Sequence, residues 1–155
     1  EIPLRLVGSE MCIRDSIAYP YLFSYFRGEE WRTQREVRRL LDRYFTTAPD
    51  GIPGNDDTGT MSAWAVFSMM GLYPDCPGEP YYTLTSPVFD KVTVTLDPKY
   101  YPAGELVIET ERSGAGDVYI GSMTLGGRPL KKYRISHGEL VGGGRLVFGL
   151  QPERK

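Results

Sequence analysis

The chain has 155 residues, of which 41% are hydrophobic, so it is long enough to bury the core of one ordinary domain. Its 18 basic and 20 acidic side chains give a net charge of -2, which excludes the strong positive field of a protein that binds nucleic acid or an anionic membrane. No apolar run approaches the roughly 20 residues that a membrane helix needs, so we expect neither a membrane span nor a nucleic-acid partner.

The first 16 residues, EIPLRLVGSEMCIRDS, follow neither helical nor strand periodicity. Their segment LVGSEMCIRDS resembles the peptide obtained when sequencing-adapter DNA is translated, so we interpret residues 1–16 as an artefactual leader. A genuine short strand and loop is the alternative. On either interpretation Cys12 carries no functional weight, and Cys12 with Cys76 makes no disulfide framework.

Residues 17–72 have the apolar spacing of helices. A first helix is predicted between Pro20, which suits a first turn, and Gly28, which suits a helix end. A second is predicted from about Glu29, with an apolar stripe on one face and arginines on the other: Arg32, Arg35, Arg38, Arg39 and Arg43. Acidic residues interleave these arginines, so we interpret them as a solvent-facing surface or a contact with neighbours missing from the chain.

A third helix is predicted from about Thr58 to Met70, ending at Gly71. Apolar side chains surround it nearly completely, which predicts a buried helix whose packing partners include residues beyond the other two helices. Both tryptophans of the chain, Trp31 and Trp64, lie on apolar helical stripes. We therefore expect them in the core rather than stacked on a sugar ring.

From about residue 81 the pattern changes to the alternation of β-strands. Strands are predicted in YYTLTSP, KVTVTLD, ELVIET, DVYIGSMTL, KKYRISHGEL and RLVFGL, and their short spacing favours an antiparallel sheet or half a sandwich. His137, in the fifth segment, is interpreted as a surface turn residue rather than a base or a metal ligand. The predicted fold class is α+β, with a boundary near residue 80.

The segment DGIPGNDDTGTMSAW places Asn55, Asp56 and Asp57 between glycines, just before the third predicted helix. The helix dipole and nearby N–H groups lower the pKa of a carboxyl group there, so either aspartate suits a base, a metal ligand or a hydrogen-bond acceptor. From residue types alone, the simpler interpretation is that Asp57 or Thr58 caps the helix. An EF-hand loop is excluded, because Val66 would stand where a bidentate Glu is required.

The chain contains three long stretches in order: PYLFSYFRGEEWRTQ, GIPGNDDTGTMSAWAVFSMMGLYP and TSPVFDKVTVTL. Together they resemble the C-terminal part of glycoside hydrolase family 92, the calcium-dependent exo-acting α-mannosidases. The resemblance implies an (α/α)-barrel catalytic domain preceded by a β-sandwich domain, calcium in the active site and inversion at the anomeric carbon. It implies that residues 17–80 are the last helices of the barrel and that residues 81–155 form a C-terminal antiparallel β segment.

The resemblance also implies roles for the acidic loop. Inverting hydrolysis needs a carboxylate base that activates water and a protonated carboxylic acid at the leaving oxygen. Carried over residue by residue, Asp57 is the first choice for the base, Asp56 is the second, and Asn55 is a neighbour that positions water, a sugar hydroxyl or the metal. The family's general acid lies upstream of the matched region, and GSEMCIRDS replaces an Asn-Glu-Pro-type segment associated with calcium. We therefore expect most calcium ligands outside this chain, and no catalysis by the chain alone.

The sequence leaves two alternative functions for the chain. In the first, the chain is a fragment of an inverting α-mannosidase that hydrolyses terminal α-linked mannose from glycans, and it contributes the general-base loop. Its partners would be mannose-containing glycans and the missing N-terminal part of the parent chain, which the resemblance implies is secreted or periplasmic. In the second, the chain is a non-catalytic carbohydrate-binding or structural β-module, in which the acidic loop only caps a helix.

Overall fold

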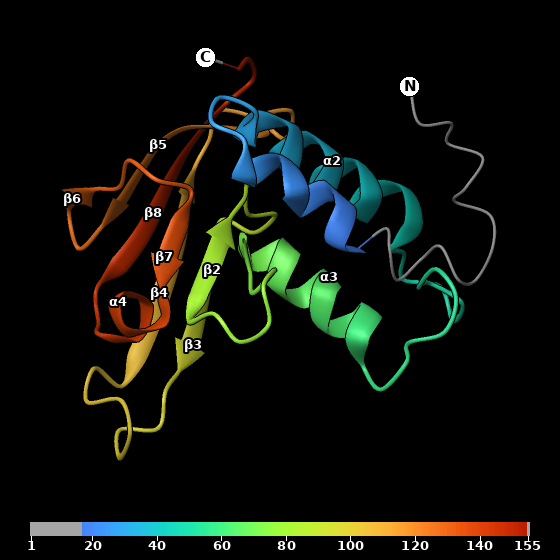
Figure 1. Cartoon of the computed structure of the whole chain (residues 1–155). Coiled ribbons are helices and arrows are strands. Elements are labelled where there is room, and N and C mark those ends of the chain that lie inside the picture. Colours follow the sequence, from blue (N-terminus) through green and yellow to red (C-terminus); the bar gives the residue numbers. More distant parts are fainter. Residues whose placement is uncertain (1–16, 155) are drawn as a thin grey trace.

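The computed structural model describes residues 17–154, so the leader predicted at residues 1–16 lies outside the described residues. Helical segments come first: η2 (Tyr19–Tyr25), α2 (Glu30–Tyr44) and α3 (Thr60–Met70). They are followed by β1 (Leu72–Tyr73), β2 (Tyr81–Leu84), β3 (Lys91–Thr95), β4 (Glu105–Glu111), β5 (Tyr119–Leu125), β6 (Arg128–Pro129), β7 (Arg134–Ser136), α4 (His137–Val141) and β8 (Arg145–Gln151). The main helices lie together on one side of the strands (Figure 1).

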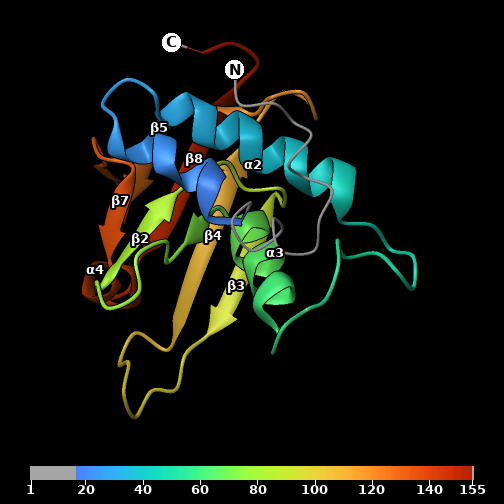
Figure 2. The same cartoon turned by 45° about the vertical axis from the view of Figure 1, so that its right-hand side comes forward.

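Local sequence signals set the ends of the helices. α3 ends at Gly71, whose φ of 88° is left-handed and whose N–H bonds back to the last turn. η2 is a 3-10 helix, and the hydroxyl of Ser24 donates to the carbonyl of Tyr21 at 2.5 Å, a local bond that competes with regular α-helical pairing. η2 lies alongside α2 in both views (Figure 2). No described helix is long and apolar enough to cross a membrane.

The strands form a five-stranded sheet in the order β3-β4-β8-β5-β6 and a three-stranded sheet in the order β1-β2-β7. The expectation of a purely antiparallel arrangement is wrong at one position, because β4 and β8 are parallel. β8 enters the sheet between β4 and β5 only after the chain has formed β5, β6, β7 and α4, a crossover long enough for a parallel pair.

The fifth predicted strand, in KKYRISHGEL, is mostly not a strand. β7 covers only Arg134–Ser136, and α4 begins at once after it. The hydroxyl of Ser136 accepts from the N–H of Glu139, and the Glu139 carboxylate accepts from the N–H of Ser136. This reciprocal capping box starts a helix where apolar alternation alone predicts a strand.

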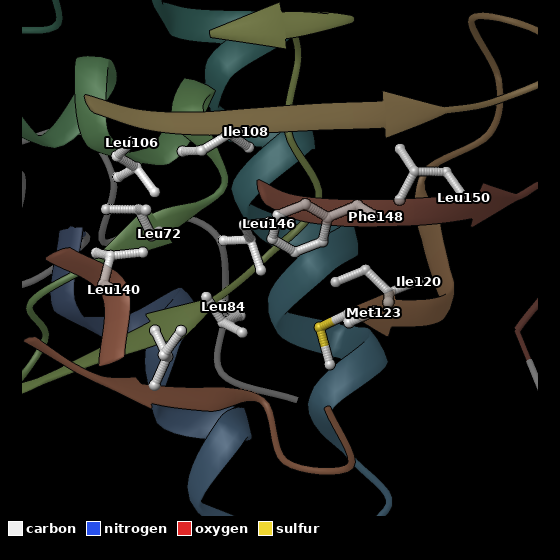
Figure 3. Packing of buried hydrophobic residues seen from close by; sticks show 11 residues of the cluster. Leu72, Leu84, Leu106, Ile108, Ile120, Met123, Leu140, Leu146, Phe148 and Leu150 are labelled. Carbon is white, nitrogen blue, oxygen red and sulfur yellow. The ribbon is translucent and has the colours of Figure 1, made fainter. Parts of the chain in front are cut away.

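The apolar side chains form two buried clusters. The larger lies mainly among the strands (Figure 3) and consists of Leu72, Leu84, Leu106, Ile108, Ile120, Met123, Ile135, Leu140, Leu146, Phe148 and Leu150. The smaller lies among the helices and consists of Tyr21, Val37, Leu41, Trp64 and Ala65. The domain boundary that we expect near residue 80 stays a prediction.

The two tryptophans differ in burial. Trp64 has an exposed fraction of 0%, stacks on Phe45 and donates from its indole N–H to the carbonyl of Ile17 at 2.9 Å, so its predicted place in the core is confirmed. Trp31 is only partly buried, and the guanidinium groups of Arg35 and Arg154 lie 4.9 and 4.5 Å from its ring centroid. Its predicted place in the core therefore holds only in part.

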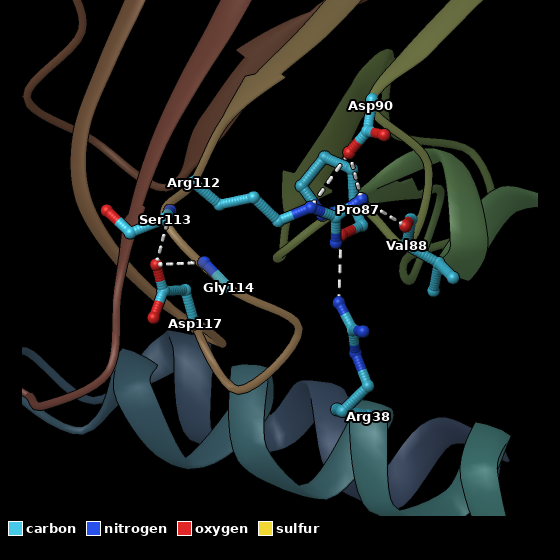
Figure 4. Close-up of polar contacts among 8 residues, drawn as sticks. All are labelled: Arg38, Pro87, Val88, Asp90, Arg112, Ser113, Gly114 and Asp117. Carbon is cyan, nitrogen blue, oxygen red and sulfur yellow. Dashed lines mark hydrogen bonds and ion pairs between the residues drawn. The ribbon is translucent and has the colours of Figure 1, made fainter.

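Polar contacts fasten α2 to the strands. The buried side chain of Gln34 accepts from the N–H of Ile120 at 2.9 Å, next to the bulge in β5. Arg38 donates to the carbonyl of Pro87 at 2.8 Å (Figure 4). Arg112, which directly follows β4, donates to Asp90 of the same segment at 2.5 Å. The contacts of Gln34 and Arg38 thus fix α2 relative to β5 and to the segment before β3.

Replacing Gln34 by Leu leaves the buried N–H of Ile120 without its acceptor, so we expect the free energy of unfolding to fall by about 1–3 kcal/mol. Urea unfolding of the purified chain, followed by tryptophan fluorescence, measures the change. Gln151→Leu is the matched control: its amide bonds the exposed carbonyl of Glu153, and we expect a change within about 0.5 kcal/mol. An unchanged unfolding midpoint in Gln34→Leu would contradict the role assigned to this contact.

α3 is buried on one side only. Met61, Trp64, Ala65 and Ser68 are buried, whereas the opposite side is exposed and includes Val66, with an exposed fraction of 56%. The prediction of a buried helix therefore holds for one face. The other face leaves apolar surface in contact with solvent in the described part of the chain.

We expect the isolated chain to bind an apolar dye and to self-associate through this exposed face of α3. Val66→Lys should lower both dye fluorescence and light scattering, because a charge there opposes apolar contact. Thr93→Lys adds the same charge at an exposed strand position and should change neither measurement. A monodisperse isolated chain that binds no dye would show that the prediction is wrong.

Candidate functional site

The acidic loop, defined as residues 55–59, leads into α3 and has an unusual backbone. Asp57, Thr58 and Gly59 have φ values of 44°, 62° and 83°, and the first two are the non-glycine residues with positive φ in the described chain. Left-handed backbone costs a β-branched residue such as threonine about 1–2 kcal/mol. Backbone strain of this kind clusters at functional sites, which makes the loop a candidate site.

Asp56 is held by the start of α3. The N–H of Ser62 donates to its Oδ1 at 2.8 Å, and the hydroxyl of Ser62 donates to its Oδ2 at 2.7 Å. The N–H of Met61 donates to the backbone carbonyl of Asp56 at 3.3 Å. The side chain of Asp56 therefore caps the start of α3, a role that the residue types alone suggest for Asp57 or Thr58.

The same contacts set the charge of Asp56. The N–H of Ser62, followed by its hydroxyl, lowers the pKa of the Asp56 carboxyl group, because both donors favour the ionised form. Since this pKa is lower in the folded chain than in the unfolded chain, the contribution of the cap to stability is present at neutral pH. It is lost as the pH falls through the folded-state pKa.

Asp57 and Asn55 lie on the solvent side of the loop. Both are exposed, whereas Asp56 is partly exposed. The hydroxyl of Thr60 donates to the backbone carbonyl of Asp57 at 2.7 Å, so the first residue of α3 fixes the main chain that carries this carboxylate. A carboxylate exposed on a fixed backbone can accept a proton from water or a hydrogen bond from a sugar hydroxyl.

His137 has partners that its sequence context does not reveal. Its Nδ1 lies 3.1 Å from the hydroxyl of Tyr82, and its Nε2 lies 3.3 Å from the hydroxyl of Tyr101. The ring is partly buried and joins β2, the loop after β3 and the start of α4. The interpretation as a surface turn residue is thus too simple, because two tyrosines distant in the sequence enclose the ring.

The arginine face of α2 forms a separate surface feature. A hollow of about 440 Å³ is lined by Arg35, Arg38, Arg39, Asp42, Arg43 and Val118. Glu36 forms ion pairs with Arg35 at 2.9 Å and Arg39 at 2.7 Å, so part of the positive charge is neutralised within the helix. The hollow is built from α2 and the segment before β5, not from the acidic loop.

The described residues do not assemble a metal site on their own. Within residues 17–154, no three His, Cys, Asp or Glu side chains lie close enough together to hold a metal ion. In the acidic loop both carboxylate oxygens of Asp56 already accept hydrogen bonds from Ser62.

Comparison with known proteins supports the sequence resemblance. A family model described as the glycosyl hydrolase family 92 catalytic domain matches residues 14–152. A protein of Arthroderma benhamiae, named an uncharacterized secreted glycosidase, is 30% identical over 147 residues, which cover 95% of this chain and 18% of that protein.

Solved structures agree. An inverting mannosidase of family 92 from Bacteroides thetaiotaomicron is 35% identical with a TM-score of 0.76, covering 88% of this chain and 18% of that one. A family 92 α-mannosidase from the same organism, in complex with mannoimidazole, is 27% identical with a TM-score of 0.77. The match covers 95% of this chain and 18% of that one. The chain thus spans less than a fifth of these relatives, and the family match extends over most of its own length. This chain belongs to glycoside hydrolase family 92.

Proposed function

We propose that this chain is the C-terminal part of an α-mannosidase that removes terminal α-linked mannose from glycans with inversion, and that the acidic loop contributes its general base. The observation that carries the proposal is the strained loop at the start of α3, which presents adjacent carboxylates in a chain of this family. The names of two solved relatives, an inverting mannosidase and an α-mannosidase in complex with mannoimidazole, support the substrate class.

In this proposal Asp57 accepts a proton from the water that attacks the anomeric carbon. Asp56 is the second candidate for this base, and Asn55 binds the water or a sugar hydroxyl beside it. The leaving oxygen receives its proton from a carboxylic acid on the opposite side of the sugar, roughly 6.5–9.5 Å from the base in inverting enzymes. That acid lies in the upstream part of the parent protein, so the isolated chain is inactive.

The calcium ion implied by the family is held mainly by residues outside this chain. The proposal is consistent with residues 17–154, in which no three His, Cys, Asp or Glu side chains lie close enough together to hold a metal ion. The parent protein is proposed to be exported, secreted or periplasmic, and the name of the Arthroderma benhamiae relative, a secreted glycosidase, supports export. Its partners are mannose-containing glycans and the upstream part of the same protein.

The alternative function, a non-catalytic carbohydrate-binding or structural β-module, draws on one observation. Asp56 caps α3, as a purely structural loop would require. However, a cap needs only one carboxylate, and it does not explain why Asp57 and Thr58 adopt left-handed backbone. A general base that must project from a fixed main chain explains both the second carboxylate and the left-handed backbone.

Asp57→Asn in the full-length enzyme should lower kcat by about 10²–10⁴-fold, because the amide keeps the shape of the side chain but cannot act as a general base. Turnover of an aryl α-mannoside measures the loss, and the thermal melt checks that the fold is intact. Asp50→Asn, at an exposed aspartate earlier in the same loop region, is the control and should retain activity. Turnover of Asp57→Asn close to that of the unmodified enzyme would contradict the proposal.

A further inference from the structure

We propose that Ser62 is a positioning residue of the acidic loop. Ser62 holds the Asp56 carboxylate by two hydrogen bonds, and this contact fixes the position of the neighbouring Asp57, the proposed base. This inference rests on the proposed function. It separates the roles of two adjacent carboxylates that the sequence leaves as alternatives.

The geometry of the Asp56 contact is that of a two-point clamp. Ser62 donates two hydrogen bonds, one from its N–H and one from its hydroxyl, and they reach the two different oxygens of a single carboxylate at 2.8 and 2.7 Å. Hydrogen bonds to an ionised acceptor are roughly twice as strong as neutral ones. Two of them on one planar group fix its orientation as well as its position.

The clamp acts on a backbone that is strained. Asp57 and Thr58 have φ values of 44° and 62°, a region that such residues leave readily unless the surroundings determine it. The Asp56 clamp holds the loop before these residues, and the bond of 2.7 Å from the Thr60 hydroxyl to the carbonyl of Asp57 holds it after them. The direction in which Asp57 leaves the main chain is therefore set from both sides.

The identity of residue 62 agrees with this role. Ser62 is exposed on α3, and serine is a poorer helix former than alanine by a few tenths of a kcal/mol on the scale of about 0–0.7. The N–H of Ser62 bonds Asp56 and caps the helix without help from the hydroxyl. The hydroxyl of Ser62 is therefore better explained by the orientation that it gives to the Asp56 carboxylate than by a contribution to the stability of the fold.

The clamp also disfavours Asp56 itself as the base. A general base must accept a proton in the transition state, and efficiency depends on a pKa suited to that transfer. A proton on Asp56 would remove the negative charge that strengthens the two bonds from Ser62, and these donors lower the pKa of this carboxyl group. Asp57 is the carboxylate that follows directly from the braced segment.

Ser62→Ala in the full-length enzyme removes the hydroxyl but keeps the N–H. We expect kcat to fall by about 10–100-fold, as for a misplaced catalytic group, with KM changed by less than about twofold. Ser62→Thr restores a hydroxyl and should recover most of kcat. The acidic limb of the pH profile of kcat/KM should stay in place, because both donors of Ser62 bond the neighbouring Asp56.

Ser136→Ala is the matched control, because Ser136 also bonds a carboxylate at a helix start, that of Glu139 on α4. It should lower the melting temperature about as much as Ser62→Ala while leaving kcat unchanged. If both variants lose kcat in proportion to their loss of stability, Ser62 has a structural role only and the inference is overturned.

Asp57→Asn and Asp56→Asn, measured in parallel, separate failure of the inference from failure of the proposed function. We expect Asp56→Asn to resemble Ser62→Ala and Asp57→Asn to be far less active. An inactive Asp57→Asn beside a fully active Ser62→Ala overturns the inference and leaves the proposed function standing. An active Asp57→Asn variant overturns both the role of Asp57 as the base and the inference that Ser62 positions this base. An upward shift of the acidic limb of the kcat/KM pH profile in Ser62→Ala would identify Asp56 as the base.

Discussion

The junction at Gly71 is the constraint on which the arrangement of helices and strands depends. Here α3 ends and β1 begins without a linker, in left-handed backbone with a φ of 88°. A Cβ atom at this position would lie 2.5 Å from Cγ of Pro87, so no other residue fits without movement of the neighbouring segment. The N–H of Thr85 donates to the carbonyl of Gly71 at 2.9 Å and closes the junction. The chain thus passes from the helical cluster to the strand cluster through one residue without a side chain.

This junction also fixes the acidic loop at the other end of α3. Trp64 and Ser68, in the middle and last turn of α3, are fully buried, and the hydroxyl of Tyr21 is hydrogen-bonded to that of Ser68 at 2.8 Å. A helix held along one face and locked at its C-terminus gives its N-terminus a defined position. The loop that begins at Asn55 therefore rests on a rigid element, which is what a general base requires of its support.

Sequence patterns predicted the elements better than their pairing. The periodicity located α2, α3 and most strands, because these depend on local side-chain spacing. The parallel pair of β4 and β8 could not be predicted, since it joins segments far apart in the chain. α4 was missed although its capping box, Ser136 and Glu139, is legible in the sequence. For the site, the motif located the loop, but the cap from Asp56 to Ser62 spans six residues and follows no standard capping spacing.

The place of β8 in the sheet has a consequence for how the chain is made. Its residues come last among the strands, yet β8 lies at the centre of the larger sheet, and Leu146 and Phe148 are fully buried there. Until residues 145–151 have been synthesised, β4 and β5 each have an unpaired edge that faces the other across an empty position. Unpaired strand edges are open to pairing with other chains. The order of synthesis therefore leaves the nascent sheet exposed to association with other nascent chains, and insertion of its final strand ends that period.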